Sequence, residues 1–236
     1  MLTLGIETSG RLGSVALVED GTLLAARSLE SKGRRHAQAL VAEAKSLFDE
    51  RGRRLARCDL VAVSIGPGSF TGLRVGVVFA KTLAYAAGCR LAAVDTFQAV
   101  AADSPDDVDA LHVVADAQRG DIYTARYVRD PGGVFRRAES IVIAEAETWC
   151  RQRLPGDVVS GPDRERCAAL LSPGWRLMTA ERRAQRAETV ARLGAKQAEE
   201  GRTDDPWTLE PLYLRKSAAE EKWESTFDGG DGSGRL

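Results

Sequence analysis

Apolar and polar residues alternate along the opening of the chain, as expected for strands that bury one face. The alternation predicts three strands and two tight turns: Leu2–Glu7, Ser14–Val18 and Thr22–Leu29, with turns at Thr8–Gly13 and Asp20–Gly21. The spacing of apolar residues then becomes helical, which predicts a helix over Arg35–Arg51. One stripe of this helix carries Leu40, Ala44, Leu47 and Phe48.

A continuous apolar run, Leu60–Ile65, predicts a buried strand. It leads into the segment Gly66–Arg74 and then into a helix predicted over Thr71–Ala87, built largely of small residues. A further strand at Leu91–Val94 and a short helix from Thr96 to Ala102 complete this half of the chain.

The segment between that strand and helix has an unusual backbone, because three glycines and a proline fall within seven residues. Ser69 and Thr71 are placed to cap the helix, whose first N–H groups have no partner inside it. A strand, a glycine loop and a helix start also form a potential anion site. We treat this segment as a signature loop: Gly66, Pro67, Gly68, Ser69, Phe70 and Thr71.

Small residues recur every fourth position along the same helix and form one low ridge: Gly72, Gly76, Ala80, Ala84 and Gly88. Each glycine in a helix costs roughly 1 kcal/mol relative to alanine, so a close backbone approach is expected at this ridge. The ridge packs either against the protein's own sheet or against another protein. The sequence leaves both interpretations open.

The opening pattern recurs weakly after a predicted linker at Asp103–Asp107. Three further strands are expected at Leu111–Asp116, Asp121–Val128 and Val134–Ile141, and the repeat predicts a two-lobed α/β fold. The remaining predicted elements are helices at Glu145–Arg153, Arg164–Leu171 and Ala184–Glu200, a strand at Asp157–Ser160, an extended stretch bracketed by Pro206 and Pro211, and a disordered tail from Ser225.

Glu7 and Asp116 each end the first strand of their half, which suggests acids facing a metal in a cleft between lobes. Thr8, Ser9 and Gly10 could contact phosphate at the same turn. The alternative is that both acids merely cap turns. No P-loop is present in the sequence, and neither histidine has an evident serine partner.

Composition is that of an ordinary soluble globular protein, with 44% hydrophobic and 28% charged residues and a formal net charge of -1. This balance does not favour unaided nucleic-acid binding. One local basic cluster is either a solvated face or the edge of a partner or RNA contact: Lys32, Arg34, Arg35, His36, Arg51, Arg53, Arg54 and Arg57.

No signal peptide and no membrane-spanning run is recognisable, and we expect a cytoplasmic protein. Four scattered cysteines are expected to be reduced thiols: Cys58, Cys89, Cys150 and Cys167. Only two histidines exist, His36 and His112, so a multi-histidine zinc site is not expected. His112 lies in an apolar run and is expected to be packed.

Five segments together resemble the TsaB (YeaZ) family of bacterial tRNA threonylcarbamoyladenosine biosynthesis proteins. The similar segments are Ile6–Ser9, Arg35–Leu40, the signature Gly66–Arg74, Asp116–Tyr123 and Glu210–Arg215, and the resemblance covers about residues 1–216. Glu7 stands where the family has aspartate, and Gln118 where it has arginine. The glycine signature matches throughout.

The resemblance implies a two-lobed actin-like/Hsp70-like (ASKHA, ribonuclease H-like) fold with a duplicated mixed-sheet unit. It implies an N-terminal lobe over 1–102 that carries the partner-binding helices, a C-terminal lobe over 108–216 and a disordered tail over 217–236. It also implies a subunit without catalysis of its own, which supports the paralogue TsaD and the ATPase TsaE. TsaD-type proteins carry His-x-x-x-His, which this chain lacks.

For this role we expect no metal and no cofactor of the chain's own, with ATP or ADP as the candidate ligand at the complex interface. tRNA would be bound through the complex, and a homodimer could form without TsaD. The expected TsaD-binding residues are His36, Leu40, Ala44, Leu47, Gly72, Arg74, Gly76, Ala80 and Ala84. The competing hypothesis is an independent ASKHA-type phosphotransferase or a peptidase-like enzyme.

Overall fold

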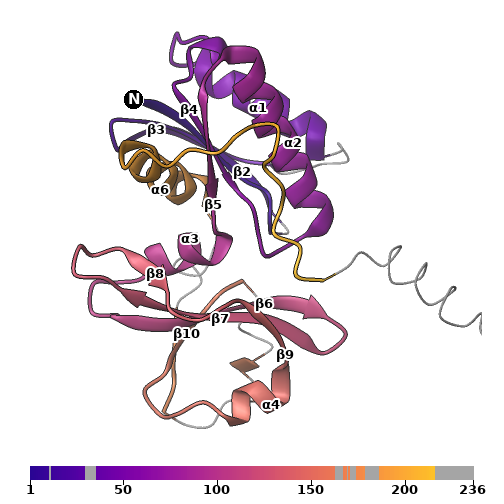
Figure 1. Cartoon of the computed structure of the whole chain (residues 1–236), viewed down its shortest axis with the longest axis vertical. Coiled ribbons are helices and arrows are strands. Elements are labelled where there is room, and N and C mark those ends of the chain that lie inside the picture. The colour runs from indigo at the N-terminus through magenta and orange to yellow at the C-terminus, as the bar shows by residue number, and fades with distance from the viewer. Residues whose placement is uncertain are drawn as a thin grey trace, which may run out of the picture.

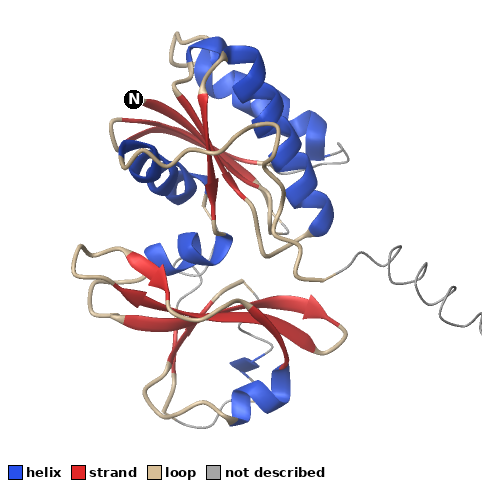
Figure 2. Ribbon diagram, viewed as in Figure 1, coloured by secondary structure: helices blue, strands red, loops and turns tan. Residues whose placement is uncertain are grey.

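The computed structural model describes residues 1–10, 12–29, 36–162, 167, 168, 170, 174–178 and 186–215. Two mixed β-sheets lie one above the other, each with its own helices (Figures 1 and 2). The predicted disordered tail and most of the helix predicted over Arg164–Leu171 lie outside the described residues. So do Lys32, Arg34 and Arg35 of the basic cluster.

The first sheet has five strands in the order β3-β2-β1-β4-β5. Its strands are β1 Leu2–Glu7, β2 Ser14–Glu19, β3 Thr22–Ser28, β4 Leu60–Ser64 and β5 Arg90–Val94. The first three strands are antiparallel neighbours, whereas β4 is parallel to both β1 and β5. The hydrophobic pattern predicted all five strands to within about two residues at each end.

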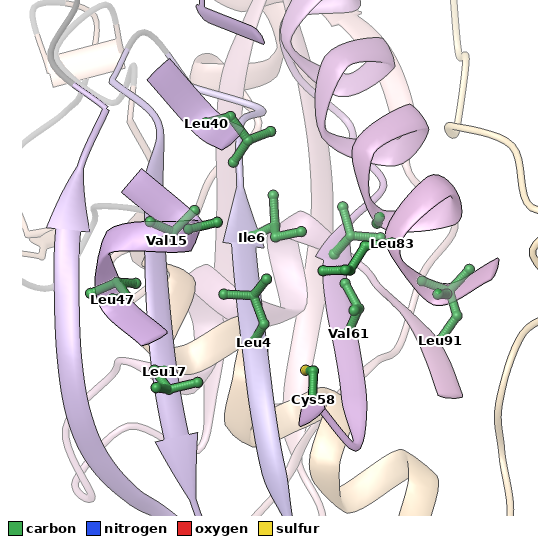
Figure 3. Packing of buried hydrophobic residues seen from close by; sticks show 14 of the residues in the cluster. Leu4, Ile6, Val15, Leu17, Leu40, Leu47, Cys58, Val61, Leu83 and Leu91 are labelled. Atoms are coloured by element: carbon green, nitrogen blue, oxygen red, sulfur yellow. The ribbon is translucent and has the colours of Figure 1, made fainter. Parts of the chain in front are cut away.

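Helices cover both faces of this sheet. One face carries α1 His36–Asp49 and α2 Phe70–Ala87, and the short 3-10 helix η1 Leu55–Arg57 follows α1. Figure 3 shows the core on this face, where residues of β1, β2 and β4 meet leucines of the two helices. The other face carries α6 Ala187–Glu199, whose Val190 and Ala198 pack on buried residues of β4 and β5.

The start of α2 follows from its cap. The Ser69 hydroxyl accepts a hydrogen bond from the Gly72 amide at 3.3 Å, so the helix begins at Phe70. Thr71 was predicted as a second cap, and this is wrong, because Thr71 lies inside the first turn and is exposed. At the other end Gly88 adopts the left-handed conformation that commonly ends helices.

The second sheet has the order β11-β10-β6-β7-β8, and β9 also pairs with β7. Its strands are β6 Ala110–Gln118, β7 Asp121–Arg129, β8 Phe135–Arg137, β9 Val142–Glu145, β10 Val158–Ser160 and β11 Arg176–Leu177. The helix α3 Thr96–Ala102 packs against β6 and β8, and α4 Ala146–Arg151 follows β9. Within the single strand predicted at Val134–Ile141 only β8 forms, and β9, which follows that range, was not predicted.

The packing differs from the prediction that one C-terminal lobe spans 108–216. The helix α6 packs on the first sheet. The segment after it, residues 202–215, which we call the C-terminal strap, is hydrogen-bonded to the first lobe, while its Leu212 and Leu214 pack against the core of the second lobe. The Asp204 amide donates to the Leu91 carbonyl at 2.8 Å, and the Leu212 amide donates to the Ile65 carbonyl at 2.8 Å. The first lobe thus consists of two separate stretches of the chain.

Candidate functional site

The signature loop lies directly on the turn that follows β1. The Ser69 amide donates a hydrogen bond to the Ser9 carbonyl at 2.7 Å. A Cβ added at Gly72 would lie 2.0 Å from the Thr8 carbonyl oxygen, and one at Gly76 would lie 2.2 Å from the Thr8 hydroxyl. Glycine is required at both positions because the turn occupies the space a side chain would need.

This contact decides between the two interpretations of the small-residue ridge. Gly72, Gly76, Ala80 and Ala84 are all buried within the chain, so the ridge packs against the protein's own β1 turn and core. Gly88 is not part of the packed surface, because it has a φ of 65° and nothing lies within 4 Å of its would-be Cβ.

Most of the predicted partner-binding residues are consequently not on a surface. Leu40, Ala44 and Leu47 have no exposed area, and the four small residues of α2 are buried as well. Helical spacing shows which residues share a face of the helix, but it does not show whether the protein's own core or a partner covers that face. The residues predicted to bind a partner lie on the inward faces of α1 and α2. Of the other two residues, Arg74 is exposed, and the side chain of His36 lies outside the described part of the chain.

The outward side of α2 carries a different set of residues, which the sequence analysis missed. Val78 and Tyr85 are 61% and 68% exposed. Trp207 of the strap is 73% exposed and packs edge-on against Tyr85, with ring centroids 5.1 Å apart. The same periodicity predicts which residues lie opposite the ridge. It does not predict that Trp207 joins them, because Trp207 meets Tyr85 only when the strap packs on α2.

Arg74 and Tyr213 continue this surface toward the start of α2. The Arg74 guanidinium lies over the Phe70 ring at 3.9 Å from its centroid, and its Nε donates to the Tyr213 hydroxyl at 2.9 Å. The Phe70 and Tyr213 rings are 4.9 Å apart. We call Arg74, Val78, Tyr85, Trp207 and Tyr213 the outer α2 face.

The strap also reaches the second lobe. Arg215 donates from Nη1 to the Ala117 carbonyl and pairs through Nη2 with Asp121 at 2.9 Å. Both partners belong to the hairpin tip between β6 and β7. Four of the segments that resemble the family thus converge: the β1 turn contacts the signature loop, the signature loop contacts the strap, and the strap contacts the hairpin tip.

Glu7 is completely buried, and its Oε1 accepts hydrogen bonds from the Ser9 amide at 2.6 Å and the Ser9 hydroxyl at 2.5 Å. Burial raises the pKa of this carboxyl, and the Ser9 hydrogen bonds offset only part of the effect. Its other oxygen has no hydrogen-bond partner. Burial thus shifts the Glu7 carboxyl toward its neutral form.

Asp116 is in a different environment from Glu7, because it is exposed and accepts a hydrogen bond from the Gln118 amide at 2.9 Å. Thr8 and Ser9 are only 5% and 3% exposed, and the signature loop covers them. The predicted phosphate contacts at these side chains are therefore closed off by the protein itself. Within the described ranges, no group of three or more His, Cys, Asp or Glu residues is placed to hold a metal ion.

The expectation that His112 is packed is confirmed. It lies edge-on to Trp149 with centroids 5.6 Å apart, and its Nε2 is 3.2 Å from Arg153 Nη1. Burial and the neighbouring Arg153 lower the pKa of the imidazole. In the basic cluster, Arg53 pairs with Glu19 at 3.0 Å and Arg51 donates to the Leu24 carbonyl, which fits a solvated face.

Comparison with known proteins places these features in a family. The chain is 31% identical over 234 residues to the tRNA threonylcarbamoyladenosine biosynthesis protein TsaB of Escherichia coli, covering 94% of this chain and 98% of that protein. The chain belongs to the TsaB family. The Bacillus subtilis TsaB protein is 27% identical over 94% of this chain and 98% of its own length.

Two further comparisons agree. The family model described as "TsaD: tRNA N6-adenosine threonylcarbamoyltransferase" matches residues 26–169, so TsaB and TsaD sequences are related here. The solved structure of YeaZ from Pseudomonas aeruginosa aligns with a TM-score of 0.76 and 25% identity, covering 90% of this chain and 99% of that chain. With the two mixed sheets, this similarity confirms the predicted two-lobed α/β fold. None of the helices in the described ranges has the length and apolar content to cross a bilayer.

Proposed function

We propose that this TsaB-family chain is a non-catalytic subunit required for tRNA threonylcarbamoyladenosine modification at the adenosine next to the anticodon. In this role it binds and supports the catalytic paralogue TsaD together with the ATPase TsaE, and it reaches tRNA through the complex. The names of the relatives support a role in tRNA threonylcarbamoyladenosine biosynthesis. The outer α2 face is the observation that supports the role, because it is an exposed apolar and aromatic surface formed by α2 and the strap.

The composition of this face suits a protein partner. Interface hot spots are enriched in Trp, Tyr and Arg, and Trp207, Tyr85 and Arg74 all lie on the outer α2 face. The aromatic pairs and the Arg74–Tyr213 hydrogen bond fix these side chains before binding, so less conformational entropy is lost on association. We assign TsaD to this face in place of the buried residues predicted from sequence.

A scaffold role is also supported by what the fold does at the β1 turn. The signature loop packs on Thr8 and Ser9, and the buried Glu7 carboxyl is held by Ser9. Because the signature loop and Ser9 occupy this turn, Glu7, Thr8 and Ser9 suit a structural role here. In an active enzyme, residues at this turn would contact nucleotide. Any ATP or ADP in the assembly is accordingly proposed to lie with the partner or at the interface.

Val78→Glu tests the assignment, because it places a charge in the middle of the outer α2 face without disturbing the core. Association with TsaD, measured by light scattering and titration calorimetry, should weaken at least ~10-fold, about 1.4 kcal/mol. The reconstituted modification reaction should fall with it. Val142→Glu, at a half-exposed residue of β9 in the second lobe, is the matched control and should bind normally.

Two results would contradict the proposal. Normal TsaD binding by both Val78→Glu and Tyr85→Ala would remove the outer α2 face from the interface. ATP hydrolysis by the isolated chain, abolished by Glu7→Ala, would instead support the independent phosphotransferase. Self-association of the isolated chain that Val78→Glu abolishes would show that the same face forms a homodimer when TsaD is absent.

A further inference from the structure

Two cysteines far apart in sequence meet where β4 and β5 begin. The two strands pair in parallel from Leu60 and Arg90 onward, and the Arg90 amide donates to the Asp59 carbonyl at 3.1 Å. Cys58 and Cys89 directly precede these hydrogen-bonded residues. Neighbouring strands lie about 4.8 Å apart, and disulfides join residues with α-carbons about 4.4–6.8 Å apart, so adjacent strand starts are within bridging range.

Both side chains pack in the same hydrophobic cluster. Cys58 is buried in the core under α1 and α2, and Cys89 packs against that core from its edge. Figure 3 shows Cys58 at one end of the cluster. The Cys58 thiol donates to the Leu60 carbonyl at 3.0 Å, and the Cys58 and Cys89 thiols are close enough to shift each other's pKa.

The two thiols differ in the way that a reactive pair requires. Cys89 is half-buried, whereas Cys58, Cys150 and Cys167 are buried, so Cys89 is the accessible thiol of the four. Interaction with Cys58 lowers the pKa of the Cys89 thiol, whereas interaction with Cys89 together with burial raises the pKa of Cys58. Susceptibility to peroxide follows thiolate character and exposure, and a neighbouring thiol resolves the first product.

We propose that Cys58 and Cys89 form a peroxide-reactive dithiol, in which Cys89 is oxidised first and Cys58 then closes an intramolecular disulfide. The Cys89 thiolate attacks one oxygen of hydrogen peroxide; the O–O bond breaks, an S–OH group forms, and hydroxide leaves. The Cys58 sulfur then attacks the Cys89 sulfur after losing its proton. The S–O bond breaks and water is released. Overall, two thiols and one peroxide give one disulfide and two waters.

The test is peroxide treatment of the reduced full-length chain, followed by thiol alkylation and non-reducing peptide mapping by mass spectrometry. The expected result is a fall from four free thiols to two, with one crosslinked peptide pair joining Cys58 to Cys89. Cys89→Ser should abolish the reaction. Cys58→Ser should stop it at a sulfenic acid on Cys89, which dimedone would trap.

The pair Cys150 and Cys167 provides the internal control, because these thiols also contact one another but are both buried. They should stay reduced in the folded protein. Four thiols retained by the wild-type chain, or a disulfide that leaves out Cys89, would overturn the proposal. Because Cys58→Ser could disturb the core, the wild-type peptide map decides the outcome independently of any variant.

Discussion

Glu7 illustrates how one residue can fit a motif and still do a different job. The sequence placed an acid at the end of the first strand, which is where a metal-binding or phosphate-binding group would be expected. In the structure the carboxyl is fully buried, bonded to Ser9 and raised in pKa by burial. The residue thus holds the β1 turn through Ser9, and burial shifts its carboxyl toward the neutral form.

This burial predicts a pH dependence of stability that Glu7→Gln should remove. Because the folded pKa is raised above the ordinary value of 4.5, the folded state keeps its proton after the unfolded chain has lost it. The contribution of Glu7 is therefore complete below pH 4.5 and is lost as pH rises through the folded pKa. In urea unfolding over a pH series, the free energy of unfolding of the wild type should fall relative to that of Glu7→Gln as the pH rises. If the two free energies change in parallel with pH, the folded pKa of Glu7 is not raised.

At the scale of elements, the role of the small-residue ridge of α2 depends on which part of the structure contacts it. The same four-residue spacing would suit a partner helix or an internal turn, and only the tertiary contact with Thr8 distinguishes them. The substitution Gly76→Leu would break a heterodimer if the ridge faced a partner, but it is expected to damage folding because the ridge faces Thr8.

Gly76→Ala is the sharper version of that experiment. A Cβ at this position would lie 2.2 Å from the Thr8 hydroxyl, so the helix or the turn must shift. Overpacking of this kind typically costs about 1–3 kcal/mol of the free energy of unfolding. Ala86→Leu adds more bulk on the exposed side of α2 and should change stability by less than about 0.5 kcal/mol. Chemical denaturation compares them, and equal midpoints would place Gly76 outside the packed contact.

Local patterns predicted much of the fold because they are set by neighbours in sequence. The five strands of the first sheet, the Ser69 cap and the buried His112 all follow from alternation, capping chemistry and apolar context. The destination of α6 could not be predicted, since its apolar stripe fits either sheet. The outer α2 face was missed for the same reason, because Tyr85 and Trp207 meet only when the strap returns to the first lobe.

At the scale of the whole molecule, the strap is the connection that holds signature loop and hairpin tip in one arrangement. Arg215→Ala removes the guanidinium contacts to Ala117 and Asp121, which are only partly exposed. We expect a loss of about 1–2 kcal/mol and faster amide exchange at residues 116–121. The control is Arg136→Ala, which breaks a more exposed pair with Asp130. Unchanged exchange at the hairpin tip would show that the lobes do not depend on this contact.

The return of α6 to the first sheet also sets an order of events during synthesis. One face of that sheet is covered by a helix that the ribosome makes after the whole second lobe. Until residues 187–199 emerge, Leu60, Ala62 and Ala92 lack the side chains that bury them. The first half of the chain, although it contains all five strands of the first sheet, must therefore wait for α6 before its fold is complete.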